Sequence, residues 1–189
     1  MVVNYKIEMD DLLALQKDAV DTTNIHKRNK IIGGLLGAIL LFLFAINFVK
    51  VTLGTALVFA IAMFFLCKSA YKLAIVRQTK KLIEKNHTLT IGDCISTISD
   101  KGFIREFKNT SQNISWSQVK IAKEDEERYF LYISDIQASI LKKIPNNLTE
   151  SELIKYHNLI RENLLNEGIV LKKTKRISSS EAVKSLHKF

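Results

Sequence analysis

The chain contains the residue types that are common in active sites, but their spacing does not match a catalytic motif. No P-loop, dinucleotide glycine motif, nucleophile elbow or paired metal-ligand motif occurs. The acidic run from Glu124 to Glu127 could attract a cation, but it lacks the ligand spacing of a calcium loop and is interpreted as a solvated turn. The histidines are scattered, at His26, His87, His157 and His187. We therefore expect no enzyme, no bound metal and no cofactor, with an enzyme of unrecognised site as the alternative.

The two cysteines also show no metal spacing. Cys67 closes an apolar run, and Cys94 lies in a strand-like segment. A chain facing a reducing cytosol has no need of a disulfide, so both are interpreted as unpaired small hydrophobic residues.

The basic residues carry a clearer signal. The chain has 28 Lys and Arg against 19 Asp and Glu, and the excess lies beside two apolar runs and in the C-terminal tail. Such charge attracts anionic lipid headgroups or nucleic acid. Because the apolar runs already explain it, we expect lipid contact and no nucleic-acid partner. The predicted membrane-surface contacts are Lys27, Arg28, Lys30, Lys68, Lys72, Arg77, Lys80 and Lys81.

The two apolar runs predict a transmembrane helical hairpin over residues 31–67. Residues 31–49 contain 19 residues without a charge and residues 51–67 contain 17, separated by Lys50. At about 1.5 Å per residue, each run is roughly as long as the hydrocarbon core of a bilayer is thick. Three basic residues precede the hairpin and six follow it, against one in its loop. The positive-inside rule therefore predicts a multi-pass protein of the cell membrane with both termini in the cytoplasm.

The hairpin contains few polar residues. It has no Asp, Glu, Arg or His between Ile31 and Cys67, which argues against a transport component, the least favoured function. Gly33 and Gly37 are spaced as in the G-x-x-x-G motif, which suits either dimerisation or packing of the two hairpin helices on each other. We favour packing within the hairpin.

Three further segments surround the hairpin. Residues 1–30 are predicted to hold a strand over 2–9, which needs a partner sheet, and a short helix with Asp10 or Asp11 as N-cap. Residues 68–86 continue the second span as a basic linker helix. Residues 169–189 form a basic, serine-containing tail.

Residues 87–168 differ from the preceding helical segments in their sequence pattern. Short β-prone runs separated by turns predict a small antiparallel sheet or barrel, with the run from Tyr129 to Ser134 as a central strand buried on both faces. Thr149 and Glu152 form a capping box for a following helix, and Gly168 suits its C-terminus. The helix should pack its apolar stripe on the sheet.

One stretch of this region resembles a known family. Ile114, Trp116, Ser117 and Val119 precede an acidic turn, an aromatic strand from Tyr129 to Ile133, and Gln137. This arrangement is similar to the core of the YcxB-like family of bacterial membrane proteins, and the order of N-terminal strand, two membrane helices and β domain extends the resemblance to nearly the whole chain except the tail. One feature departs from the family, because the basic pair Lys142 and Lys143 precedes Pro145 instead of following a proline.

The resemblance implies a pleckstrin-homology-like (PH-like) fold, a bent antiparallel sheet closed by a C-terminal helix. It implies no activity, and Trp116 is interpreted as an aromatic anchor of a turn on the core. The expected protein is thus an α+β membrane protein whose PH-like domain faces the cytoplasm. Its expected role is that of a non-catalytic interaction or accessory module at the inner leaflet, with the lipid bilayer and an unknown protein as partners.

Overall fold

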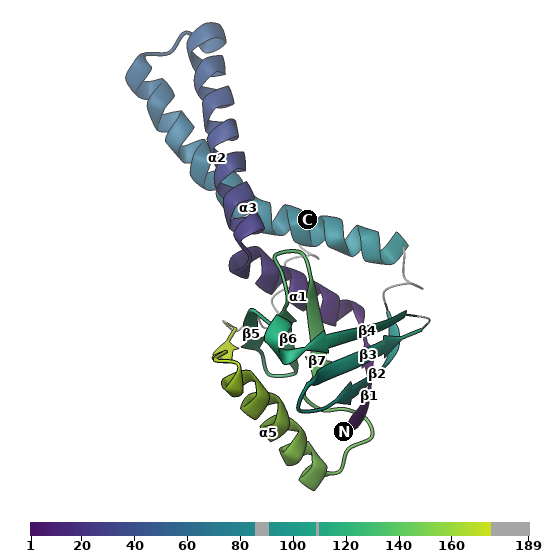
Figure 1. Cartoon of the computed structure of the whole chain (residues 1–189). Coiled ribbons are helices and arrows are strands. Elements are labelled where there is room, and N and C mark those ends of the chain that lie inside the picture. The colour runs from purple at the N-terminus through teal and green to yellow at the C-terminus, as the bar shows by residue number, and fades with distance from the viewer. Residues whose placement is uncertain (86–90, 109, 175–189) are drawn as a thin grey trace. The chain divides into compact units, whose positions relative to one another are not determined.

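A computed structural model describes residues 1–85, 91–108 and 110–174. The chain is α+β, with two long apolar helices and antiparallel sheets (Figure 1). It divides into two compact units. The β unit comprises Met1–Lys6 and the chain from Gly92 onward, and the helical unit comprises Ile7–Ile91. Each unit is described by itself below.

The first sheet of the β unit is an antiparallel meander. Its four strands are β1 (Val2–Ile7), β2 (Gly92–Ile98), β3 (Gly102–Phe107) and β4 (Thr110–Ser115), in the spatial order β1-β2-β3-β4. The predicted turn before Gly102 joins β2 to β3, and Gly102 adopts a φ of 156° there. A Cβ at this position would lie 2.2 Å from a backbone oxygen, so the turn requires glycine.

The N-terminal strand joins this sheet, as its alternating pattern predicted. The Met1 amino group donates to the Ile98 carbonyl at 2.7 Å, and the Ile98 amide returns a bond of 2.7 Å to the Met1 carbonyl. Such reciprocal bonds are typical of antiparallel pairing. On the other edge of β1, the Asn147 side chain accepts from the Asn4 amide and donates to the Val2 carbonyl. The edge strand is therefore closed by a side chain.

The second sheet has the order β7-β6-β5-β8. Its strands are β5 (Ile121–Glu124), β6 (Arg128–Tyr132), β7 (Ala138–Lys142) and the short β8 (Lys172–Lys173), which pairs with β5 in parallel. Four consecutive residues of β6, from Tyr129 to Tyr132, are buried. The prediction of a central strand covered on both faces is confirmed.

Helix α5 (Glu150–Asn166) follows the second sheet and begins at the predicted capping box. The Thr149 amide donates to the Glu152 carboxylate at 2.9 Å. Tyr156, Ile160 and Leu164 lie on the buried stripe of the helix. Gly168, at a φ of 72°, follows the C-terminus as expected.

Aromatic side chains dominate the core of the β unit. Trp116, in the 3₁₀ turn η2 (Trp116–Gln118), is 1% exposed, packs against Phe103 with ring centroids 5.4 Å apart, and donates its indole N–H to the Ser99 carbonyl at 2.8 Å. The interpretation of Trp116 as the anchor of a turn is confirmed. Tyr5 of β1 donates to the Ile140 carbonyl at 3.0 Å, which ties the first sheet to the second.

The helical unit contains α1 (Met9–Thr22), α2 (Asn24–Phe44), the π-helical turn η1 (Ala45–Val49) and α3 (Leu53–Lys85). The prediction that Asp10 or Asp11 caps α1 was wrong. Glu8 is the N-cap, and Asp11 closes the capping box by accepting from the Glu8 amide at 2.8 Å. The pattern was misassigned because the first residues of the helix continue the apolar alternation of the strand.

Helices α2 and α3 pack side by side as a hairpin (Figure 1). A Cβ added at Gly34 would lie 2.8 Å from the Phe64 ring, and one at Gly37 would lie 2.7 Å from Cys67 Sγ. Gly33 has no neighbouring atom within 4 Å. Small residues on α2 thus allow close packing within the hairpin, which is the interpretation that we favoured, but the pair that does so is Gly34 and Gly37.

Several predicted boundaries change. The β unit does not begin at residue 87 and end at residue 168, because β1 belongs to it and β8 lies beyond Gly168. Strand β4 was not predicted, since its sequence, TSQNIS, is polar with one buried residue, Ile114. The predicted second span and linker helix form one helix, α3, which starts at Leu53 instead of residue 51. Residues 86–90 and the tail from 175 onward lie outside the described residues.

Candidate membrane-interface site

The hairpin presents a large apolar surface. Asn24–Val49 and Leu53–Lys85, of 26 and 33 residues, are long and apolar enough to cross a membrane. Within the described chain, only 11% of the most apolar part of each is buried. The core helix of a water-soluble domain would bury most of that stretch instead. The large apolar side chains of the hairpin that are more than half exposed include Leu36, Ile39, Leu40, Phe44, Phe48, Val49, Leu53, Leu57, Val58, Phe65 and Leu66.

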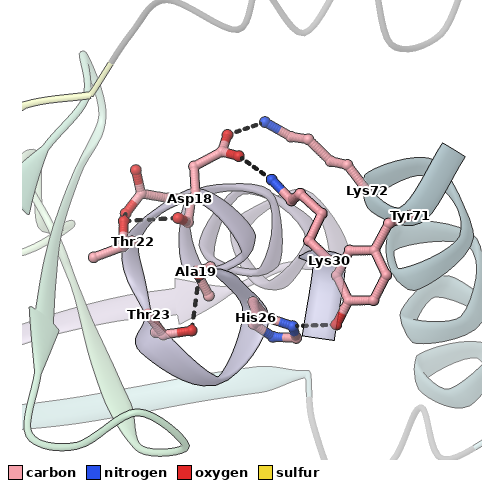
Figure 2. Close-up of polar contacts among 9 residues, drawn as sticks. Asp18, Ala19, Thr22, Thr23, His26, Lys30, Tyr71 and Lys72 are labelled. Atoms are coloured by element: carbon pink, nitrogen blue, oxygen red, sulfur yellow. Dashed lines mark hydrogen bonds and ion pairs between the residues drawn. The ribbon is translucent and has the colours of Figure 1, made fainter. Parts of the chain in front are cut away.

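A cluster of polar contacts joins the three helices of this unit next to the start of the apolar run (Figure 2). The Asp21 carboxylate of α1 receives Lys30 Nζ of α2 at 3.1 Å on one oxygen and Lys72 Nζ of α3 on the other. One carboxylate is thus shared by two ammonium groups from different helices, and we call this arrangement the Asp21 clamp.

A second contact in the same cluster uses uncharged groups. His26 Nδ1 of α2 and the Tyr71 hydroxyl of α3 are 2.9 Å apart, and their rings meet edge to face with centroids 6.0 Å apart (Figure 2). The other ring nitrogen of His26 lies 3.3 Å from Gln16 Nε2 of α1. The imidazole therefore bridges the same three helices as the Asp21 clamp.

The local sequence explains why α1 and α2 meet at this point. Thr23 has an extended backbone, with φ −81° and ψ 147°, and separates the two helices. Its hydroxyl donates to the Ala19 carbonyl at 3.0 Å, and the Thr22 hydroxyl donates to the Asp18 carbonyl at 2.7 Å (Figure 2). The Ala19 carbonyl also accepts the Thr23 amide at 2.9 Å, so the threonine hydroxyls add second hydrogen bonds to carbonyls in the last turn of α1.

The clamp favours the ionised form of Asp21. Partial burial acts to raise the pKa of this carboxyl, but the hydrogen bonds from Lys72 and then Lys30 outweigh it and lower the pKa below its usual value of 3.8. Asp21 therefore remains charged at neutral pH and offsets part of the positive charge at the base of the hairpin.

The structure brings together only two of the eight predicted membrane-surface residues, Lys30 and Lys72. Lys80 lies 3.9 Å from Glu84 on the same helix. The other five are exposed and make no ion pair with the part of the chain that the structure describes: Lys27, Arg28, Lys68, Arg77 and Lys81.

The sequence did not reveal Asp21, His26 or Tyr71 as parts of one cluster. Asp21 and Lys30 are nine residues apart, and the bend at Thr23 breaks any helical periodicity between them. His26 lies 45 residues from its partner Tyr71. The one available signal was that His26 and Tyr71 flank the two apolar runs on their charged side.

The described residues include no group of three or more His, Cys, Asp or Glu side chains that could hold a metal ion. The contacts of the cluster instead join helices α1, α2 and α3 to one another.

Comparisons with protein-family models, with curated proteins and with solved structures found no match to this chain.

Proposed function

We propose that this chain is a multi-pass protein of the cell membrane, anchored by α2 and α3, with both termini and the β unit in the cytoplasm. The β unit acts as a non-catalytic interaction or accessory module at the inner leaflet. The observation that carries this proposal is the exposed apolar surface of the hairpin, bounded by basic residues.

The distribution of side chains on α2 supports membrane insertion. Gly34 and Gly37 face α3, whereas Leu36, Leu40 and Leu43 are at least half exposed. Exposed apolar area costs about 25 cal/mol per Å² in water, so a surface of this extent is unfavourable unless lipid or protein covers it. Each helix is long enough to cross the hydrocarbon core of a bilayer.

Chain connectivity supports placing both ends of the hairpin on one side. Strands β1 and β2 are neighbours in one sheet, and the whole helical unit lies between them in the sequence. A chain that leaves a folded sheet and returns to the adjacent strand must have both ends on the same side of the membrane. The excess of Lys and Arg at those ends favours the cytoplasmic side.

We also propose that the β unit is PH-like and that the chain belongs with the YcxB-like proteins. An antiparallel meander of β1 to β4, a second sheet built around β5, β6 and β7, and the following α5 agree with that expectation. The inserted hairpin after the first strand agrees with the family's order of elements.

The structure narrows the set of residues proposed to touch anionic headgroups. Lys30 and Lys72 are partly neutralised by Asp21, and Lys80 has Glu84 nearby. Exposed cations near an anionic surface contribute about 1 kcal/mol each. We therefore assign lipid contact mainly to the five exposed residues without ion pairs, which are Lys27, Arg28, Lys68, Arg77 and Lys81.

Cysteine labelling in intact cells tests the anchor and its orientation. Cys67 and Cys94 are first replaced by alanine, and single cysteines are then introduced at Lys50, between η1 and α3, or at Ile136, which is 87% exposed in the β unit. A membrane-impermeant maleimide should label the cysteine at position 50 in intact cells and the one at 136 only after lysis. Labelling at 136 in intact cells would refute the cytoplasmic orientation, and release of the protein by alkaline carbonate would refute membrane insertion.

A further inference from the structure

We propose that the β unit carries a binding site for a phosphate monoester on the face formed by α5 and β5, with His157 and Arg161 as the donors to the phosphate oxygens and Lys143 as a supporting charge. This site lies outside the Asp21 clamp and outside the basic residues assigned to lipid contact. It does not depend on the membrane proposal.

The first observation is a compact cluster of charged and aromatic side chains. Glu124 of β5 forms an ion pair with Lys143 at 2.8 Å, and its carboxylate is only 10% exposed. Lys143 Nζ lies over the Tyr129 ring, 5.2 Å from its centroid. The Tyr129 hydroxyl is 2.8 Å from His157 Nδ1 of α5. Residues from β5, β6, α5 and the segment after β7 therefore converge.

The second observation concerns the protonated nitrogen of His157. Burial raises the pKa of Tyr129 to about 12, so the phenol keeps its proton at neutral pH, and we assign His157 the tautomer in which Nδ1 accepts this proton. Accepting at Nδ1 leaves the hydrogen of a neutral imidazole on Nε2. Within the described part of the chain, Nε2 has no hydrogen-bond acceptor. The ring therefore offers one oriented N–H donor.

The third observation is that the Arg161 guanidinium has hydrogen-bond donors left for a ligand. Arg161 lies one helical turn after His157 and so shares its side of α5. Its side chain is 56% exposed, and its distance of 3.7 Å from the Glu124 carboxylate is too long for a hydrogen bond. A hydrogen bond to Tyr129 occupies part of its donor capacity, out of five N–H groups in all.

The local charge favours an anion. Lys143 already pairs with Glu124, so the charge of Arg161 is in excess by one within this cluster. Lys172 and Lys173 of β8 are exposed and lie beside β5, where they add to the positive potential. Burial and the charges of Arg161 and Lys143 lower the pKa of His157 below its usual value of 6.5. This pKa is what a bound anion would raise.

A phosphate monoester fits these groups better than a carboxylate does. It carries up to two negative charges and three terminal oxygens, which can accept from a planar guanidinium and from an imidazole N–H at once. The same chemistry occurs in soluble phosphorylated metabolites and in a lipid headgroup that ends in a monoester. The experiment below separates these two sources.

Histidine-selective NMR on the full chain in detergent micelles measures binding. The Cδ2–Hδ2 signal of His157, assigned from His157→Gln, is followed during titration with glycerol 3-phosphate and, in parallel, with sodium sulfate and sodium chloride. We expect saturable shifts with glycerol 3-phosphate at lower concentration than with sulfate, no saturation with chloride, and a rise in the pKa of His157 when the phosphate is bound.

Two variants with the same change of charge supply the control. Arg161→Gln and Lys155→Gln each remove one cation from the same helix, and Lys155 lies outside the cluster. Loss of one charge-assisted hydrogen bond should weaken binding by Arg161→Gln roughly 10- to 100-fold, with little change in Lys155→Gln. The proposal is overturned if the two variants lose affinity equally, if the His157 pKa does not rise, or if sulfate and phosphate bind alike.

The same His157 signal, measured in lipid nanodiscs, distinguishes a lipid headgroup from a soluble metabolite as the source of the phosphate. Phosphatidic acid presents a monoester headgroup with up to two negative charges, whereas phosphatidylglycerol presents a diester with one. If the site takes a headgroup, His157 shifts in phosphatidic acid nanodiscs without added ligand. If it takes a free metabolite, the signal moves only when glycerol 3-phosphate is added. A shift in phosphatidylglycerol nanodiscs equal to that in phosphatidic acid nanodiscs would overturn the preference for a monoester.

Discussion

The two units of this chain place their large apolar side chains in opposite ways. In the β unit, Phe103, Trp116, Tyr129 and Tyr156 are almost completely buried. In the helical unit, large residues such as Leu40, Phe48 and Leu57 are at least half exposed. The difference indicates that the two units fold against different surroundings. The β unit removes its apolar surface from water by packing, while the hairpin needs lipid or protein to cover it.

Polar side chains differ between the units in the same manner. In the β unit they lie throughout the structure, and several satisfy buried carbonyls, as Tyr5 and Trp116 do. In the helical unit, an ion pair and a hydrogen bond between helices lie close together at Asp21 and His26, next to the start of the apolar run. In the proposed membrane arrangement, these polar bonds lie where lipid and water meet.

Removing an aromatic side chain from the β-unit core should have the largest effect on stability. Phe103→Ala leaves a cavity beside Trp116, and truncation of a buried Phe costs about 3–5 kcal/mol of unfolding free energy. Trp116 is the single tryptophan of the chain, so its fluorescence during denaturant unfolding reports on this unit. Ile104→Ala, at a 37% exposed position on the same strand, is the control and should cost less than about 1 kcal/mol.

A charge placed on the apolar surface tests whether the two units have different surroundings. Leu40 is 67% exposed and lies near the middle of the predicted first span. Leu40→Arg should lower membrane insertion by about 2.5–3.5 kcal/mol, measured as the fraction of the protein that resists alkaline extraction. Ile136→Arg, at an 87% exposed position of the β unit, should be neutral within about 0.5 kcal/mol. Equal effects of the two substitutions would mean that both positions face water.

Glycine substitutions in α2 should reveal which face packs inside the hairpin. Gly37→Val overpacks the contact with Cys67 Sγ and should destabilise the hairpin by about 1–3 kcal/mol, measured by circular dichroism during titration with a denaturing detergent. Gly33→Val has the same helix propensity change but open space around it. If Gly33→Val and Gly37→Val instead both abolished self-association, the G-x-x-x-G pair would form a dimer contact.

Much of the architecture was predictable because it rests on periodicity and end signals. The apolar runs, the alternation in β1, the turn before Gly102 and the capping box at Thr149 each act over a few residues, and each appears where expected. Strand β4 was missed because its hydrogen bonds to β3 are made by the backbone, and its mostly exposed side chains carry no alternating pattern.

The candidate sites were less predictable, because their contacts join distant segments. Asp21 and Lys72 are 51 residues apart, and Tyr129 and His157 are 28 apart. No local pattern relates such residues. The sequence indicated Lys30 and Lys72 only as membrane-surface cations and His157 only as one of four scattered histidines. Only the packing of helices and strands brings each of them to its partner.

The smallest expected effect is the pH response of the β unit. The pKa of His157 in the β unit is lower than its usual 6.5, so the unfolded chain binds a proton more readily at this residue than the folded chain does. The β unit should therefore lose stability as the pH falls below about 6.5. Asp21 also has a lowered pKa, but its contribution to the helical unit is complete above its usual 3.8 and is lost only below that pH.

Denaturant titrations between pH 7.5 and pH 5 measure this response. Trp116 fluorescence should show the β unit becoming less stable across this range. His157→Gln should remove the change in the fluorescence midpoint, because no titrating group remains at that position. His26→Gln, in helix α2 of the helical unit, is the matched control and should leave the change in the fluorescence midpoint in place. Loss of the pH response in both variants would indicate that the two units unfold as one.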